Sequence, residues 1–150
     1  MVEATIPTLE GLFEYYGNAS RPIAHFPFNF EFINMKKEFN AQDIFDIVHE
    51  WFTKMPEGSW ANWLVGNHDN GRVASKFRKE IIDSFNMIVV LLPGNGVTYY
   101  GEEIGMEDTW ISWEDTVDPA GCNAGPDRYE LFTRDPERTP MQWTEEDFAG

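Results

Sequence analysis

The periodicity of the sequence predicts an α/β fold in which strands alternate with helices and pair in parallel. Short apolar segments typical of strands are followed by longer segments with helical spacing. Polar clusters follow the C-terminal ends of the short strands, which is where folds of this kind place their chemistry. Of the 150 residues, 42% are apolar and 15% are aromatic, which is ample for a packed core.

The N-terminal part of the chain predicts a helix and then a strand. Residues 9–16 carry apolar side chains at helical spacing, namely Leu9, Leu12, Phe13 and Tyr16. Pro7 suits the first turn of this helix, and Gly17 suits its C-terminal end. Residues 26–32 alternate with period two, which predicts a strand that has Pro27 near its start.

A second helix is predicted to begin after Asn40 and to end before Pro56. Asn40 can cap it, and Asp43 three residues later completes a variant of the capping box. The apolar residues at helical spacing are expected to form its buried face, namely Ile44, Phe45, Val48, Trp51 and Phe52.

Three further elements follow in the second half of the chain. Residues 63–66 indicate a short buried strand. Residues 77–92 have a helical stripe, although residues 88–92 taken alone would suit a strand, and the length favours a helix. Residues 97–100 indicate another short strand, and from Gly101 onward we expect a long loop without clear periodicity.

The charge balance excludes several classes of partner. The chain has 11 Lys and Arg against 26 Asp and Glu, a net charge of −15, which argues against binding to nucleic acid or to anionic lipid. No apolar run approaches the roughly 18 residues of a membrane span, and residues 1–5 do not resemble a signal peptide. The single Cys122 excludes a disulfide framework within the chain and also zinc ribbons and iron–sulfur sites.

The cluster at residues 67–72, N-H-D-N-G-R, is the strongest local signal for a functional site. Several polar side chains follow a buried strand directly, and desolvating them there is costly unless they serve a purpose. One interpretation is a helix N-cap formed by Asp69 or Asn70. The others are a catalytic Asp, a metal site and a sugar-binding site, and the spacing leaves all of them open.

Other charged residues indicate a functional site only when they are considered together. Glu3 taken alone is a solvated carboxylate, but together with Asp69 at one edge of a sheet it would supply the carboxylate pair that glycoside hydrolysis needs. The alternating charges of residues 134–138 suit a surface turn or an Arg that holds a carboxylate or a sugar hydroxyl. The acidic residues at 114–127 lack the spacing of a calcium loop. No residue is assigned as a metal ligand and no cofactor is assigned, while calcium use stays open. Asn18 opens an N-glycosylation sequon.

Longer motifs resemble the α-glucosidases (maltases) of glycoside hydrolase family 13, of the insect digestive type. These motifs are WLVGNHDNGR at residues 63–72, TYYGEEIGME at 98–107 and RDPERTPMQW at 134–143, with IAHFPFNF at 23–30 in support. The resemblance extends over essentially all 150 residues.

The resemblance implies a (β/α)8 TIM barrel and a retaining hydrolysis of α-linked glucose. It implies that Glu3 is the acid/base and that Asp69 stabilises the oxocarbenium-like transition state. It also implies that His68 binds a glucose hydroxyl and that Arg134, with Arg138 beside it, holds the terminal glucose. Glu3 must then carry a proton at the working pH, which we expect from burial and a nearby carboxylate, whereas Asp69 must stay ionised.

The resemblance places residues 1–150 at strands five to eight of the barrel. The chain is therefore expected to form a partial catalytic domain, the C-terminal half of a barrel, since a whole barrel takes about 250 residues. The N-terminal half with the nucleophile Asp and the C-terminal β-domain are expected to be absent from it. A half barrel has two open sheet edges, so we expect the isolated chain to be inactive and prone to aggregation.

The predicted function is hydrolysis of terminal α-linked glucose from small substrates such as maltose, sucrose and related oligosaccharides. The resemblance implies an extracellular enzyme, either secreted or membrane-anchored. Two alternatives stay open, a non-catalytic relative such as the heavy subunit of an amino-acid transporter and a maltase-like surface protein that binds a partner. The combined presence of Glu3, His68, Asp69 and Arg134 counts against the transporter subunit but not against the surface protein.

Overall fold

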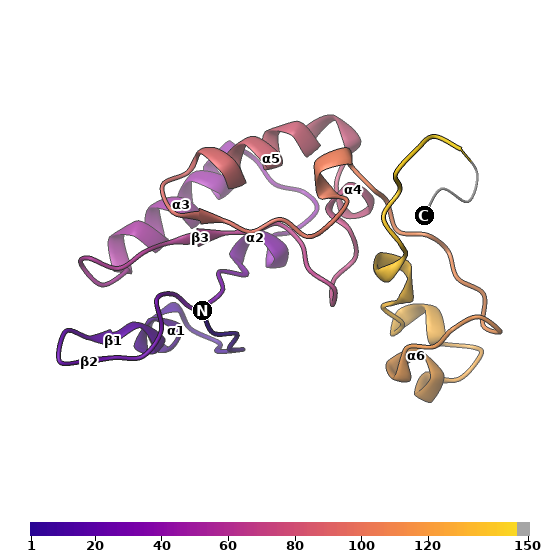
Figure 1. Ribbon diagram of the computed structural model, residues 1–150, viewed down its shortest axis with the longest axis horizontal. Coiled ribbons are helices and arrows are strands. Elements are labelled where there is room, and N and C mark those ends of the chain that lie inside the picture. The colour runs from indigo at the N-terminus through magenta and orange to yellow at the C-terminus, as the bar shows by residue number, and fades with distance from the viewer. Residues whose placement is uncertain (147–150) are drawn as a thin grey trace. The chain divides into compact units, whose positions relative to one another are not determined.

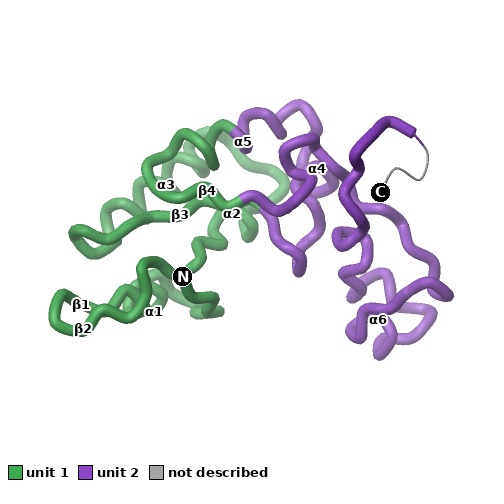
Figure 2. The backbone as a smooth tube through the Cα atoms, viewed as in Figure 1, with its two compact units in different colours: residues 1–65, 87–97 green, residues 66–86, 98–150 purple. Residues whose placement is uncertain are grey.

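A computed structural model describes residues 1–146, which divide into two compact units (Figures 1 and 2). Unit 1 comprises residues 1–65 and 87–97, drawn in green in Figure 2, and unit 2 comprises residues 66–86 and, within the described part of the chain, 98–146, drawn in purple. No helix in the described part of the chain is both long enough and apolar enough to cross a membrane.

Unit 1 contains the parallel strand segments that the sequence predicts. Val2 pairs in parallel with Pro27. The Val2 N–H donates to the Phe26 carbonyl at 3.1 Å, and the Phe28 N–H donates to the Val2 carbonyl at 3.0 Å. Strand β3 (Asn62–Trp63) pairs in parallel with β4 (Asn95–Gly96).

A buried amide joins these two pairs. The Asn62 Oδ1 accepts a hydrogen bond from the Asn29 N–H at 3.0 Å, and the Asn62 Nδ2 donates to the Pro27 carbonyl at 2.6 Å. Both asparagines are fully buried. The chain segments at residues 2, 27, 62 and 95 therefore lie side by side in that order, and the predicted parallel arrangement is confirmed.

The first predicted helix is confirmed as α1 (Leu9–Phe13), which continues as a 3₁₀ turn over Glu14–Tyr16. Thr8 caps it by accepting the Gly11 N–H at 3.2 Å, so Pro7 lies before the cap and not in the first turn. Gly17 ends it with a φ of 74°, a conformation that favours glycine.

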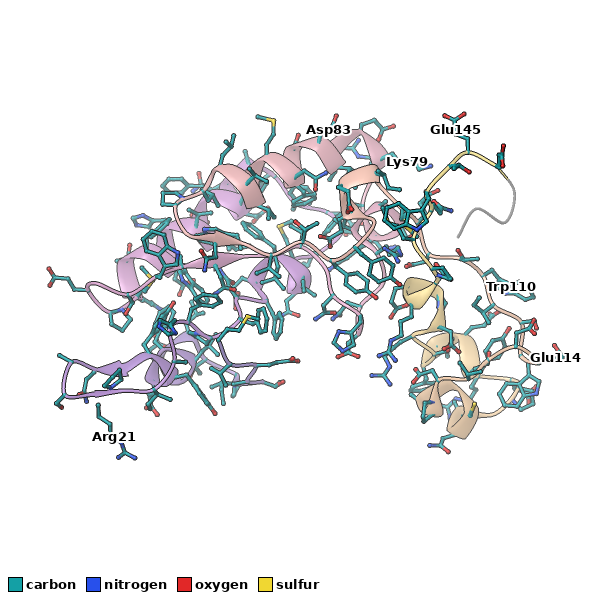
Figure 3. All side chains as sticks on the ribbon, viewed as in Figure 1. Arg21, Lys79, Asp83, Trp110, Glu114 and Glu145 are labelled. Carbon is teal, nitrogen blue, oxygen red and sulfur yellow. The ribbon has the colours of Figure 1, made fainter. Side chains whose placement is uncertain are left out.

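A short antiparallel hairpin follows that the sequence did not predict. It consists of β1 (Gly17–Asn18) and β2 (Arg21–Pro22). The Asn18 Oδ1 closes its turn by accepting the N–H groups of Ser20 at 3.0 Å and Arg21 at 2.9 Å. Figure 3 shows the Arg21 side chain projecting outward from this hairpin.

The predicted strand at residues 26–32 is wrong in its second half. The chain forms helix α2 (Glu31–Asn34) there, in which Phe32 and Ile33 are buried. The Asn29 Oδ1 accepts the Glu31 N–H at 3.1 Å, and this local bond turns the backbone out of the strand direction. Alternating apolar residues did not reveal this because one short turn of helix can bury the same side chains.

Helix α3 (Ala41–Lys54) begins as predicted, because Asn40 and Asp43 form a capping box. Its predicted buried face is only partly correct. Trp51 is fully buried and packs edge-on against Phe13, with ring centroids 4.9 Å apart. Phe45 is 56% exposed and Phe52 is 38% exposed, because the described elements that pack against α3, among them α1, α2 and β3, cover only part of its apolar face.

The helix predicted at residues 77–92 is confirmed in type as α5 (Ile82–Leu91), which follows a 3₁₀ turn at Lys79–Ile81. The alternative of a strand at residues 88–92 is therefore wrong. A shorter helix, α4 (Val73–Lys76), precedes it. The strand predicted at residues 97–100 is shifted, since β4 lies at Asn95–Gly96 and pairing ends where the Val97 N–H donates to the Trp63 carbonyl.

The segment after Gly101 is not one irregular loop as expected. It contains helix α6 (Pro119–Ala124) and 3₁₀ turns, which span Glu102–Ile104, Tyr129–Leu131 and Asp135–Arg138. These elements are too short to produce a detectable period in the sequence.

Candidate active site

The polar residues after β3 form a tight turn. Asn67 pairs with Asn70 across it, and the Asn67 Oδ1 accepts the Asp69 N–H at 3.0 Å and the Asn70 Nδ2 at 2.9 Å. Helix α4 begins later, with Arg72 at its N-cap. The interpretation of Asp69 or Asn70 as a helix cap is therefore wrong.

Two guanidinium groups hold the Asp69 carboxylate. The Asp69 Oδ1 accepts the Arg134 Nη1 at 2.7 Å and the Arg138 Nη2 at 2.8 Å. His68 lies on the other side, with its Nε2 3.5 Å from the Asp69 Oδ2, and the Arg138 Nε donates to the His68 carbonyl at 2.7 Å. Such charge-assisted bonds suit an ionised carboxylate and fix its orientation.

A second carboxylate lies on the far side of Arg134. The Asp118 Oδ2 accepts the Arg134 Nε at 2.9 Å, and the Asp118 Oδ1 accepts the Arg134 Nη2 at 2.6 Å. These bonds hold the pKa of Asp118 well below its usual range, and the bond to Asp118 raises the pKa of Arg134. Arg134 therefore bridges two carboxylates and stays positively charged.

Asp135 fixes the backbone around this pair. Its Oδ2 accepts the N–H groups of Val117 at 2.8 Å and Asp118 at 3.0 Å, and the hydroxyl of Thr133 at 3.0 Å. Burial opposes the charge of Asp135, but the two backbone bonds keep its pKa below the ordinary value. The segments at residues 117–118 and 133–135 are thus held together by polar bonds.

A buried carboxyl group and a buried guanidinium lie behind the turn. The Glu102 Oε2 accepts the Tyr99 N–H at 2.9 Å, and burial raises the pKa of Glu102 to about 7. A Cβ atom added at Gly66 would collide with the Glu102 Oε1, so a larger residue directly before the polar turn would force the Glu102 carboxyl group to shift. The Arg72 Nη1 donates to the Tyr100 carbonyl at 2.7 Å, and its guanidinium lies 4.8 Å from the centre of the Tyr100 ring.

Two tyrosines connect the second and third sequence motifs. The Tyr99 hydroxyl donates to the Glu137 carbonyl at 3.2 Å, and the Tyr100 hydroxyl donates to the Thr139 carbonyl at 2.6 Å. Glu137 is itself buried, which raises the pKa of its side chain to about 7. The position of the 3₁₀ turn that carries Arg138 therefore depends on Tyr99 and Tyr100, which follow β4.

The structure brings together four of the residues predicted for the site. They all belong to unit 2, namely His68, Asp69, Arg134 and Arg138. Glu3 belongs to unit 1, next to the paired Val2, and it is exposed among the described residues, so they do not provide the burial expected around it. Asn18 is also exposed in unit 1, at the hairpin turn.

Sequence reasoning missed Asp118 and treated Glu102 only as a residue that could cap the loop or brace the site. Asp118 looked like one of several acidic residues in a loop, and only its position before Pro119 hinted at a structural role, as the N-cap of α6. Glu102 looked like a brace at best. Among residues 1–146, no group of three His, Cys, Asp or Glu side chains is arranged to hold a metal ion.

The sequence matches one protein family over residues 1–150, and that family is described as the alpha amylase, catalytic domain. The chain belongs to the alpha-amylase family. Membership explains why polar residues follow the strand ends, since the catalytic domains of this family are (β/α)8 barrels.

Known relatives of the chain have related names. Maltase A1 of Drosophila melanogaster is 48% identical over 144 residues, which are 95% of this chain and 25% of that protein. The salivary alpha-glucosidase of Anopheles gambiae is 47% identical over 143 residues, 95% of this chain and 24% of that protein. The human amino acid transporter heavy chain SLC3A1 is 32% identical over 148 residues, 99% of this chain and 20% of that protein. The chain thus spans about a quarter or less of these relatives.

A solved structure gives the fold. The alpha-glucosyl transfer enzyme XgtA superimposes with a TM-score of 0.81 and 27% identity, over 99% of this chain and 27% of that chain. Together with the family, this confirms the predicted fold class, part of a (β/α)8 barrel, and the described residues do not form a closed barrel.

Proposed function

We propose that this alpha-amylase family chain contributes the transition-state carboxylate of a retaining α-glucosidase. The substrates would be maltose, sucrose and related oligosaccharides with a terminal α-linked glucose. The observation that carries the proposal is the Asp69 carboxylate, which directly follows a buried strand and is held by Arg134 and Arg138 at 2.7 and 2.8 Å.

The chemistry of glycoside hydrolysis explains why such a carboxylate is needed. Positive charge develops at the anomeric carbon in the oxocarbenium-like transition state, and a fixed negative charge stabilises it. Asp69 is held by groups that keep it in one orientation, so it needs little reorganisation when that charge appears. Its Oδ2 lies on the side of His68, where it can accept a hydroxyl of the sugar.

The remaining roles are assigned to residues around this carboxylate and to Glu3. Arg134 and Arg138 orient the Asp69 carboxylate and hold the terminal glucose, and His68 donates to one of its hydroxyl groups. Glu3 protonates the leaving oxygen and afterwards activates water as a base. A retaining mechanism also needs a carboxylate nucleophile, a role that none of these five residues takes.

The enzyme is proposed to act outside the cell. The Anopheles relative is named a salivary enzyme, which supports secretion. Asn18 is proposed as an N-glycosylation site, because it is exposed in a hairpin turn and Ser20 lies two residues later. The Ser20 hydroxyl donates to the Asn18 Oδ1 at 2.7 Å, so the two sequon side chains already lie together.

One alternative is favoured by a specific observation. The 32% identity to the human transporter heavy chain covers almost the whole segment, so a non-catalytic subunit shares this part of the fold. The Asp69 site discriminates between the two functions, because a subunit without catalysis does not need a carboxylate held by two guanidinium groups.

The test measures kcat and KM on maltose and sucrose for the full-length enzyme that carries this segment. Asp69→Asn is expected to lower kcat by roughly 10²- to 10³-fold, the size found when one group that stabilises a transition state is removed. Asp127→Asn, an exposed aspartate of the same unit, is the matched control and should change kcat by less than about twofold. Wild-type protein without α-glucosidase activity, or full activity in Asp69→Asn, would contradict the proposal.

The isolated segment offers a second test. Residues 1–150 expressed alone are expected to be inactive and to aggregate, since the outer sheet edges at residues 2 and 95 lack a partner strand among the described residues. A soluble preparation of residues 1–150 with maltase activity above background would refute this expectation.

A further inference from the structure

We infer that Asp118 is a positioning residue for Asp69. It acts through Arg134, by holding the guanidinium in the one orientation that presents Nη1 to the Asp69 carboxylate. This inference rests on the proposed glucosidase function, since it deepens the account of the same site.

The hydrogen bonds around Arg134 define its orientation. The Asp118 carboxylate accepts the Arg134 Nε at 2.9 Å and the Nη2 at 2.6 Å, which is the paired geometry that a planar guanidinium forms with a carboxylate. The Asp118 Oδ2 also accepts the backbone N–H of Arg134 at 2.9 Å. With one edge of the guanidinium occupied, the remaining Nη1 points toward Asp69 and donates to its Oδ1 at 2.7 Å.

The carboxylates of Asp118 and Asp69 differ in burial, and this gives them different roles. The side chain of Asp118 is 0% exposed, whereas those of Arg134 and Asp69 are 35% and 36% exposed. Asp118 therefore cannot touch a substrate, and any effect on the reaction passes through Arg134. A buried carboxylate destabilises the fold unless it is paired. The buried Asp118 therefore favours the one Arg134 orientation that pairs with it.

The charges of the cluster also balance. Asp69 and Asp118 carry two negative charges, and Arg134 and Arg138 carry two positive charges. Without the Asp118 charge, the Arg134 side chain could adopt other rotamers and bind the Asp69 carboxylate in a different geometry. A displacement of about 1 Å at a reacting group can cost about 10²-fold in rate.

Asp135 provides a matched control on the same loop. Its carboxylate accepts the backbone N–H groups of Val117 and Asp118 and the Thr133 hydroxyl, whereas the Arg134 guanidinium donates to Asp118 and Asp69. Asp135→Asn should therefore weaken the loop and lower Tm, as Asp118→Asn does, while the paired bonds from Asp118 to Arg134 remain possible. Loop damage and loss of orientation are separated in this way.

The experiment is a double-mutant cycle in the full-length enzyme, with kcat/KM on maltose and Tm measured for each variant. Asp118→Asn is expected to lower kcat/KM by roughly 10- to 100-fold, and Asp135→Asn by less than about threefold at a similar fall in Tm. In the Arg134→Ala background, Asp118→Asn should change kcat/KM by less than about twofold, because the residue it acts through is gone.

Arg134→Lys keeps the test decisive if Asp118→Asn does not fold. Lysine can neutralise the buried Asp118 charge but lacks the planar fork. The variant is expected to keep a Tm close to the wild type and yet to lose kcat/KM about as Arg134→Ala does. Full activity in Arg134→Lys would overturn the inference.

The remaining outcomes are also decisive. An active wild type in which Asp118→Asn keeps its activity, or loses the same factor in the Arg134→Ala background, would overturn the role of Asp118 alone. A wild type without activity on α-glucosides would overturn the proposed function and, with it, this inference.

Discussion

The two units of the chain bury very different polar groups. In unit 1 the buried polar side chains are two neutral amides, Asn29 and Asn62, within a core of aromatic residues. In unit 2 the buried polar side chains include four that can carry a charge, namely Arg72, Glu102, Asp118 and Glu137.

This difference distinguishes buried polar side chains that stabilise the fold from those that serve the proposed site. The amides of unit 1 join neighbouring strand segments, and a neutral group that is hydrogen-bonded costs little to bury. Charged groups cost several kcal/mol each to desolvate and recover this only through well-oriented partners. In unit 2 the desolvated charged groups lie around the turn at residues 67–70, where the proposed chemistry requires oriented side chains. A functional site is expected to accept such a loss of stability.

The largest effect is expected from the aromatic core of unit 1. Trp63 is fully buried and packs near Phe32 and Phe52, with ring centroids at 5.9 and 5.5 Å. Trp63→Ala should lower the free energy of unfolding by about 3–5 kcal/mol, because it removes a large side chain and leaves a cavity. Urea unfolding of the full-length protein measures this loss.

The control for that prediction is Trp60→Ala. Trp60 is a largely exposed tryptophan of the same unit, whose Nε1 donates to the Asn95 Oδ1 at 3.0 Å. It should lose less than about 1 kcal/mol. Equal losses in the two variants would show that burial in unit 1 does not set its stability.

The next effect concerns the contact between Gly66 and Glu102 in unit 2. Gly66→Ala should lower the free energy of unfolding by about 1–3 kcal/mol, because the added Cβ collides with the Glu102 Oε1. In a Glu102→Ala background the same substitution should cost clearly less, since the opposing atoms are gone. Equal costs in both backgrounds, measured by urea unfolding, would mean that Gly66 is required for another reason.

The buried carboxyl group of Glu102 in unit 2 predicts that the free energy of unfolding depends on pH. Burial raises its pKa from 4.5 to about 7, so the folded state holds the proton more tightly than the unfolded state. Its contribution to stability is complete below about pH 4.5 and is lost as the pH rises through about 7. The loss is on the order of 1–3 kcal/mol.

Glu102→Gln should flatten this dependence between pH 5 and pH 8. A smaller slope of the same sign remains, because burial also raises the pKa of Glu137 to about 7. Glu103→Gln, at the exposed neighbouring position, is the matched control and should leave the slope unchanged. Urea unfolding at the two pH values measures the slopes, and identical curves for wild type and Glu102→Gln would contradict the prediction.

The smallest effect on stability is expected at the start of α3 in unit 1, where the Asn40 side chain caps the helix through local hydrogen bonds. Asn40→Ala should cost about 1 kcal/mol, because the Asn40 Oδ1 no longer accepts the Gln42 N–H. Asp46→Ala removes only an exposed side-chain bond from Gln42 and should cost about 0.2–0.5 kcal/mol. Thermal unfolding ranks the two variants, and the reverse order would contradict the role of the cap.

The sequence by itself determined the elements that depend on local signals. The capping residues Asn40 and Asp43 and the helical spacing that follows defined the start and type of α3, since a cap and its helix lie within a few residues. Gly17 marked the end of the first helix for the same reason. Asp69 became a candidate because polar residues directly after a buried strand are unusual, and the three motifs identified the family.

Where a sequence pattern suited both a strand and a helix, only the tertiary structure decided which of the two forms. It also decided which charged side chains are buried. Residues 26–32 alternate like a strand, but at Asn29 the backbone N–H donates to the Asn62 Oδ1, 33 residues further along the chain, and α2 begins at Glu31 instead. Asp118 is indistinguishable in the sequence from its exposed acidic neighbours, because its burial depends on Arg134, which lies 16 residues further along the chain. Local propensity acts over one or two turns, whereas desolvation and ion pairing depend on groups that only the folded chain brings together.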